Sequence, residues 1–153
     1  MSSALVIGYG NPLRGDDGIG PAVASAFDDA AEGAGTRAII CHQLMPELAE
    51  CLASVDVAIF VDATVEAAPG TVTTRQVEAA SPPPGFGLGH VATPAALLDL
   101  AAKLYGRAPV AFLVTIGVSS LSLSETLSDT AAAALPVAIA TVRQLLIEHV
   151  AAD

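Results

Sequence analysis

Short apolar runs alternate with longer amphipathic segments along the chain, and this alternation is typical of an α/β protein. Four of the runs have the length and aliphatic content of buried strands: residues 4–7, 37–41, 57–61 and 108–116. A fifth segment, residues 71–77, alternates in polarity and is expected to form an edge hairpin or strand.

Apolar residues recur at helical spacing between these strands. The first helix is expected to begin near the pair Asp16-Asp17, with one of the two aspartates as its cap. A second helix begins near Pro46, and a third follows the capping pair Thr93-Pro94. The last is expected over residues 125–150, with a kink or break at Pro136.

The resulting order, β-α-β-α-β-β-α-β-α, predicts a three-layer α/β/α domain on a mostly parallel sheet of about five strands. Such a domain is phosphorylase/hydrolase-like. No linker composition divides the chain, so residues 1–153 are expected to form a single domain. Apolar residues make up 53% and aromatic residues only 4%, so the core is expected to consist of small aliphatic side chains.

The charge of the chain limits its partners. The net charge is −10, with six lysines and arginines, so nucleic acid and anionic membranes would be repelled. No apolar run approaches the roughly 20 residues of a membrane span, and no signal peptide is expected. Cys41 and Cys51 form no C-x-x-C motif or disulfide framework, which favours a cytoplasmic location.

The most informative stretch is the glycine-rich loop after the first strand, Gly8-Tyr-Gly-Asn-Pro-Leu-Arg-Gly-Asp-Asp-Gly-Ile-Gly20. A dinucleotide site is disfavoured because Leu13 occupies the third glycine position and the Asp16-Asp17 pair would repel a pyrophosphate. The lysine of a P-loop is also absent from it. The loop instead presents carboxylates at a strand end, where ligand sites of open α/β sheets form.

Three groups fall at predicted strand ends or in loops beyond them: Asp17, Asp62 and His90. Two carboxylates and an imidazole suit a divalent metal such as nickel or zinc, which would polarise a carbonyl or activate water. Taken singly, each has a structural alternative, as a cap or a loop histidine, and the same holds for His42.

Two other readings remain open at this point. Asp17 and Asp62 can share a proton and act as an acid/base pair on a peptide bond without a metal. Alternatively, the acidic crevice binds a metal or a basic tail without catalysis. Acyl-enzyme chemistry is disfavoured, because the chain has no G-x-S-x-G elbow and neither cysteine has the flanks of a nucleophile.

The glycine-rich motif resembles the signature of the [NiFe]-hydrogenase maturation endopeptidases. The resemblance continues in order through residues 60–63, 69–71, 89–90 and 114–117. It implies an endopeptidase that removes the C-terminal extension of a nickel-loaded hydrogenase large-subunit precursor and recognises the nickel of that substrate. The nickel ligands, which are also the catalytic residues, would then be Asp17, Asp62 and His90.

The resemblance also implies substrate contacts in the first loop. Gly10 and Asn11 would shape this loop and contact the substrate backbone. Many members of the family carry Glu where this chain has Asp17, so Asp16 is either the ligand instead or a substrate contact. His42 replaces an acidic residue after the second strand and becomes a candidate substrate or metal contact. A non-catalytic nickel-binding or chaperone module for hydrogenase assembly is the alternative from another functional class.

Overall fold

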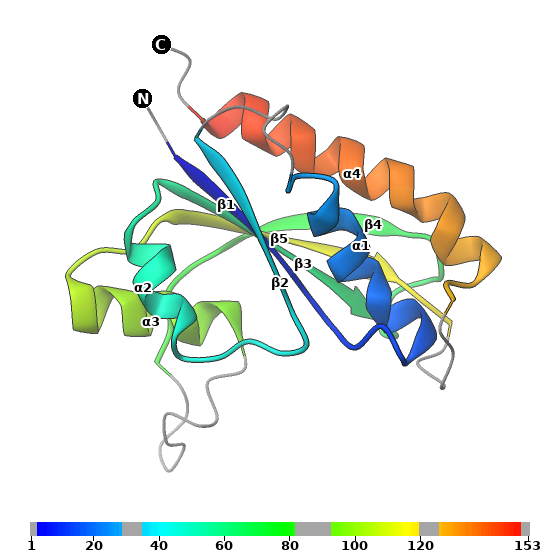
Figure 1. Ribbon diagram of the computed structural model, residues 1–153, viewed down its shortest axis with the longest axis horizontal. Helices are drawn as coiled ribbons and strands as arrows, with labels where there is room; N and C mark the ends of the chain where they lie inside the picture. The colour runs from blue at the N-terminus through cyan, green and yellow to red at the C-terminus, as the bar shows by residue number, and fades with distance from the viewer. Residues whose placement is uncertain (1–2, 29–34, 82–92, 120–125, 151–153) are drawn as a thin grey trace.

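A computed structural model describes residues 3–28, 35–81, 93–119 and 126–150. Five strands form one sheet in the order β2-β1-β3-β5-β4 (Figure 1). Four strands are parallel, and β4 pairs antiparallel with β5 at one edge, so the predicted mostly parallel sheet and its edge strand are confirmed. The strands are β1 (Ala4–Tyr9), β2 (Thr36–Cys41), β3 (Val57–Thr64), β4 (Val72–Val77) and β5 (Val110–Gly117).

Helices cover both faces of the sheet (Figure 1). α1 and α4 pack on one face and on each other, and α2 and α3 pack together on the other. The α/β/α layering predicted from the element order is therefore confirmed. The helices are the 3-10 turn η1 (Gly15–Gly18), α1 (Ile19–Ser25), α2 (Leu48–Ala53), α3 (Pro94–Tyr105) and α4 (Asp129–His149).

The strand sequences explain why the sheet lies in the middle. Successive side chains of a strand point to opposite faces, so a strand buried on both faces reads as a continuous apolar run. In β1, Val6 joins the core beneath α1 and α4, while Leu5 and Ile7 join the core beneath α2 and α3. β3 divides in the same way, with Ile59 on the first face and Phe60 on the second.

Two predicted boundaries shift in the structure. β3 continues to Thr64, so Asp62 lies inside the strand rather than directly after it. α4 begins at Asp129 and passes through Pro136 as one helix, so of the predicted kink or break at this residue the break is wrong. Ala132, whose carbonyl would accept from an N–H at position 136, is exposed, so water can satisfy the group that proline leaves unpaired.

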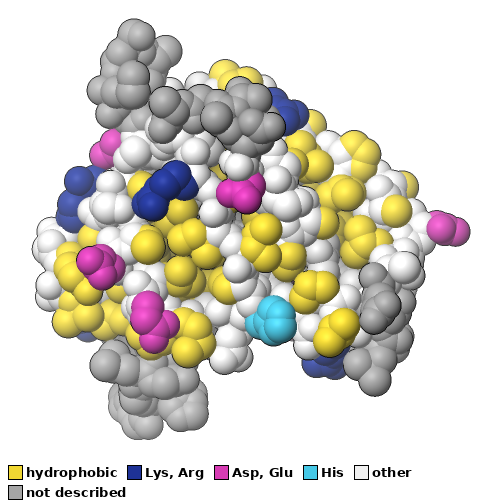
Figure 2. Space-filling model, viewed as in Figure 1, with side chains coloured by type: hydrophobic (Ala, Val, Ile, Leu, Met, Phe, Trp, Pro, Cys, Tyr) yellow, Lys and Arg dark blue, Asp and Glu magenta, His cyan; other side chains and the backbone are white. Residues whose placement is uncertain are grey.

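α4 is also the described helix that meets the length and composition of a membrane span, with 21 residues and a mean hydropathy of 1.6. The sequence pattern did not reveal it, because one proline and several polar residues interrupt the run. It meets this criterion by length and composition only, and a helix that packs on a sheet can meet it too. The buried residues of α4 belong to the core beneath α1 and α4. On the face seen in Figure 2, charged side chains are scattered among apolar and uncharged ones.

Candidate functional site

The candidate site lies where the chain reverses its direction across the sheet. From β1 the chain crosses through α1 to β2 on one side, and then returns through α2 to β3 on the other side of β1. α1 and α2 cover opposite faces, so the loops that follow β1 and β2 diverge. In open α/β sheets, ligands bind in the crevice formed at such a switch point. Here that crevice lies beyond the carboxyl ends of β1 and β3.

The backbone of the first loop holds Asp17 in place. The Asn11 N–H donates a hydrogen bond to Asp17 Oδ2 over 2.6 Å. Gly10 has φ +146°, and a Cβ at this position would collide with the backbone carbonyl of Asp17. Gly10 and Asn11 therefore allow the loop to close tightly on Asp17, whose side chain stays partly exposed. Their predicted contact with substrate stays a prediction.

Asp16 has a different environment from its neighbour. It is 4% exposed, and no other charged residue in the described part of the chain is buried. Its two oxygens accept hydrogen bonds from Ser128, one from the backbone N–H over 2.7 Å and one from Oγ over 2.8 Å. Ser128 is the N-cap of α4, so Asp16 links the first loop to that helix.

The expectation that one aspartate caps the first helix is wrong. Neither η1 nor α1 has a side-chain cap among its hydrogen bonds. Asp16 and Asp17 instead bond to groups outside their own helix, Ser128 and Asn11. Both oxygens of Asp16 accept hydrogen bonds from Ser128. The predicted contact between Asp16 and substrate stays a prediction.

Asp62 lies in an electrostatically unusual position on β3. The pKa of its carboxyl group is raised to about 6, chiefly by burial, with the negative charge of Asp17 adding to the rise and a hydrogen bond with the Tyr9 side chain opposing it. Burial also raises the pKa of the Tyr9 phenol above its ordinary value, and Asp62 adds to that shift. Carboxyl groups whose pKa is shifted by burial and by a neighbouring charge are frequent in functional sites.

Sequence reasoning missed Tyr9. The signal was present, because alternation along β1 places Tyr9 on the same face as Leu5 and Ile7. Gly8 pairs with Val61, which brings the next residues of the two strands, Tyr9 and Asp62, side by side. Only the pairing of β1 with β3 shows that this aromatic residue adjoins the predicted ligand.

Hydroxyl groups continue this row toward the edge of the sheet. Asp62 pairs with Thr115 on β5, and Thr115 pairs with Thr73 on β4, so the three side chains lie on the same face. The Oγ1 atoms of the two threonines are 2.6 Å apart and share a hydrogen bond. Sequence analysis did not single out either threonine.

The two histidines predicted as site residues, His90 and His42, differ in their position relative to the site. His90 lies outside the described residues, four positions before α3 begins at Pro94. His42 is exposed directly after β2, an edge strand, and β1 separates that strand from Asp62. Within the described part of the chain, no three histidine, cysteine or acidic side chains form a group able to hold a metal. The described residues thus contribute two interacting carboxylates, Asp17 and Asp62, to the site.

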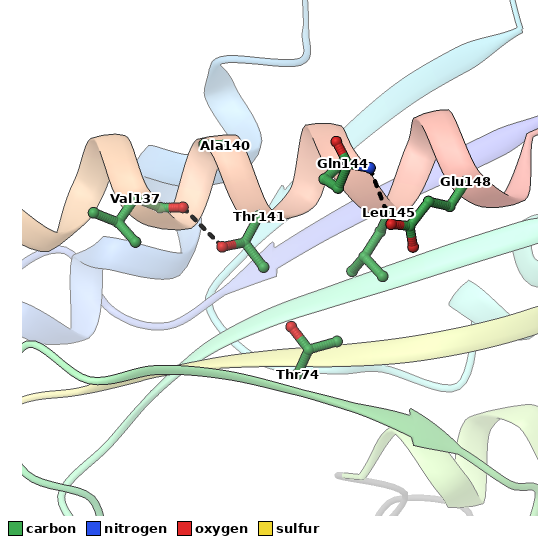
Figure 3. Close-up of a pocket in the computed structure, with 7 residues that line it drawn as sticks. All are labelled: Thr74, Val137, Ala140, Thr141, Gln144, Leu145 and Glu148. Carbon is green, nitrogen blue, oxygen red and sulfur yellow. Dashed lines mark hydrogen bonds between the residues drawn. The ribbon is translucent and has the colours of Figure 1, made fainter.

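A groove of about 430 Å³ lies elsewhere, between α4 and β4 (Figure 3). Thr74 contributes to it from β4 and pairs with Val114, whose side chain packs beneath α1 and α4. The groove is therefore on the opposite face of the sheet from Asp62. It is lined by Thr74, Val137, Ala140, Thr141, Gln144, Leu145 and Glu148.

Comparison with known proteins gives matches among solved structures. No family model and no curated protein sequence matches the chain. The hydrogenase maturating endopeptidase HybD from E. coli is 26% identical with a TM-score of 0.75, over 95% of this chain and 93% of that one.

Two further structures are similar in fold. The hydrogenase 2 maturation peptidase from Thaumarchaeota archaeon SCGC_AB-539-E09 is 24% identical with a TM-score of 0.69, over 94% of this chain and 97% of that one. The [NiFe] hydrogenase maturation protease HycI from Thermococcus kodakarensis is 17% identical with a TM-score of 0.72, over 95% of this chain and 93% of that one. Over nearly its whole length, this chain is therefore structurally related to the hydrogenase maturation endopeptidases.

Proposed function

We propose that this protein is an endopeptidase of hydrogenase maturation, which removes the C-terminal extension of a nickel-loaded [NiFe]-hydrogenase large-subunit precursor. The observation that carries the proposal is the match to the E. coli endopeptidase HybD, which is 26% identical over 95% of this chain. The position of Asp17 and Asp62 supports it, because both adjoin the crevice where such a fold binds ligands.

In this proposal the nickel belongs to the substrate. Asp17, Asp62 and His90 supply oxygen and nitrogen ligands, a donor set that suits nickel. An incomplete site finishes its coordination sphere only on a nickel-loaded precursor, so an unloaded precursor is bound less well and cut more slowly. Held by these residues, the nickel of the substrate would supply a Lewis acid for the scissile carbonyl or the attacking water.

A second candidate needs no metal. Asp17 and Asp62 interact electrostatically, and two carboxyl groups at such a site can share one proton and serve as acid and base on the peptide bond. This mechanism does not use His90 and does not depend on the nickel content of the precursor. The two candidates therefore differ in measurable ways.

The test is the intact mass of a nickel-loaded large-subunit precursor from the same organism before and after incubation with the protein. A nickel-free precursor is the control. Loss of a C-terminal peptide from the loaded form alone is expected. Equal cleavage of both forms would contradict nickel recognition, whereas binding of the precursor without any loss of mass would indicate a non-catalytic module.

Variants then assign the residues. Asp62→Ala and His90→Ala are each expected to reduce cleavage at least a hundredfold while the protein stays folded. Asp28→Ala and His149→Ala are matched controls, because both residues are exposed and lie outside the site. Full activity of His90→Ala on nickel-loaded precursor would remove this residue from the mechanism and favour the carboxylate pair.

A further inference from the structure

The hydroxyl pair on β5 and β4 has one donor to spare. Each threonine hydroxyl carries one proton, and the hydrogen bond between Thr73 and Thr115 uses one of the two. No other side-chain bond of these two hydroxyls exists among the described residues. Thr73 is exposed and Thr115 is half-buried, so a ligand above this face can reach the pair.

Arg75 brings a positive charge to the same face. It pairs with Leu113, whose side chain belongs to the core beneath α2 and α3, so the Arg75 side chain leaves the sheet on the same side as Asp62. Within the described part of the chain, Arg75 takes part in no hydrogen bond or ion pair. Burial and Asp62 raise the pKa of the Tyr9 phenol on β1, and the positive charge of Arg75 opposes that shift.

Arg37 also lacks a hydrogen bond or ion pair in the described part of the chain, but only Arg75 lies beside the hydroxyl pair, two residues along β4 from Thr73. We infer that Arg75, Thr73 and Thr115 form a subsite that binds a carboxylate of the precursor's C-terminal extension. This inference rests on the proposed function and names the chemistry by which the site recognises its peptide. The planar guanidinium fork fits a carboxylate with two parallel hydrogen bonds, and the spare hydroxyl proton adds a third.

The sheet geometry gives the distance of this subsite from the predicted nickel ligand. Thr73 and Asp62 lie on strands separated by β5, which corresponds to about 10 Å between neighbours spaced about 4.8 Å apart. An extended peptide advances about 3.3 Å per residue, so about three residues bridge this span. The carboxylate is therefore expected about three residues from the group held at Asp62.

The experiment compares Arg75→Gln with Arg37→Gln on the nickel-loaded precursor, with cleavage followed by intact mass. Arg37 is a matched control because it is exposed, lies on the other edge strand and pairs with Leu5 on the same face, but at the opposite end of the sheet. Arg75→Gln is expected to raise KM about tenfold with little change in kcat, since it removes binding shared by ground and transition states. Arg37→Gln is expected to leave both constants unchanged.

Companion variants distinguish recognition from bulk charge. Arg75→Lys keeps the charge but loses the fork, so an intermediate KM is expected. Thr73→Val and Thr115→Val each leave one hydroxyl that can still donate to the carboxylate, so each is expected to raise KM only about threefold to fivefold. The urea midpoint of Arg75→Gln should equal that of the wild type. A KM for Arg75→Gln within twofold of the wild-type value, or an equal rise in Arg37→Gln, would overturn the inference.

Changes in the precursor identify the carboxylate. Replacing the acidic side chains of the extension by their amides tests a side-chain carboxylate, and adding a C-terminal amide tests the chain end. The correct change should raise the KM of the wild-type protein to that of Arg75→Gln and have no further effect on that variant. If neither change does so, Arg75 does not bind a peptide carboxylate.

Calorimetric binding of the uncleaved precursor separates this inference from the proposed function. If the wild type binds but does not cleave, the proposed function fails, and the ratio of the two Kd values still decides whether Arg75 binds the extension. If the wild type cleaves and Arg75→Gln binds equally well, only the subsite fails. If the nickel-loaded precursor does not bind at all, both are refuted.

Discussion

The link between Asp16 and Ser128 makes the stability of the fold depend on a residue next to the predicted nickel ligand. Ser128 Oγ donates to Asp16 and also accepts from the Ala131 N–H as the cap of α4. Ser128→Ala removes both bonds. A hydrogen bond to a carboxylate contributes about 1.5–3 kcal/mol and an N-cap about 1 kcal/mol, so we expect a loss of about 2.5–4 kcal/mol.

A double-mutant cycle isolates the bond between the two side chains. Asp16→Asn keeps the volume of the side chain and weakens its hydrogen bonds with Ser128, at an expected cost of about 1–2 kcal/mol. The double variant should lose less than the sum of the single losses, with a coupling of about 1–2 kcal/mol. Urea unfolding followed by circular dichroism measures each corner. For a chain of this length, the Tm of Ser128→Ala should fall by about 5–15 °C.

The control is Ser54→Ala. The hydroxyl of Ser54 is exposed and donates only to the carbonyl of Cys51 at the end of α2, so its loss should cost less than about 1 kcal/mol. A coupling between positions 16 and 128 below about 0.3 kcal/mol would show that the Asp16–Ser128 bond does not contribute to stability. Equal losses in Ser54→Ala and Ser128→Ala would refute the reasoning as well.

Three further predictions concern single residues. Tyr9→Phe removes the hydrogen bond to the predicted ligand on β3 and should lower kcat/KM about threefold to tenfold, whereas the control Tyr105→Phe, at an exposed site, should not; equal rates would contradict the role given to the phenol. Gly10→Ala should cost more than about 2 kcal/mol in urea unfolding, because its Cβ meets backbone, whereas Gly106→Ala, with positive φ but open space around it, should cost about 1 kcal/mol. The pKa of Asp56 is lowered in the folded state, chiefly by the backbone N–H of Ser3 and next by Arg107. The stabilisation that Asp56 contributes is therefore complete above its unfolded pKa near 4 and is lost as the pH falls through the folded pKa. Acid titration of the Asp56→Asn variant should lack this loss of stability.

Local patterns predicted most of the fold because they report burial. The apolar runs became the four parallel strands, and the Thr93-Pro94 pair caps α3 as expected, with the Thr93 hydroxyl accepting from Ala96 N–H. The end of β3 was missed because Asp62 interrupts the apolar pattern while its backbone continues to pair with β5. Pairing between strands, rather than hydropathy, decides where this strand ends.

The site was harder to predict because its contacts join distant parts of the chain. The bond between Asp16 and Ser128 spans 112 positions, and no spacing rule connects them. Tyr9 and Thr115 reach Asp62 only through the register of neighbouring strands. A sequence can therefore nominate carboxylates at strand ends, but their supporting residues follow from the strand order, which short motifs do not encode.

The two adjacent aspartates show how the structure divides a motif that the sequence left ambiguous. In a 3-10 turn, successive side chains point about 120° apart, so neighbours cannot serve the same site. Asp16 points inward and both its oxygens accept bonds from Ser128, whereas Asp17 is half-buried and interacts with Asp62 across the crevice. We therefore assign the ligand role in the proposed mechanism to Asp17. Substitution by asparagine should separate the pair: Asp16→Asn lowers the free energy of unfolding, and Asp17→Asn lowers cleavage of the nickel-loaded precursor while the urea midpoint changes less.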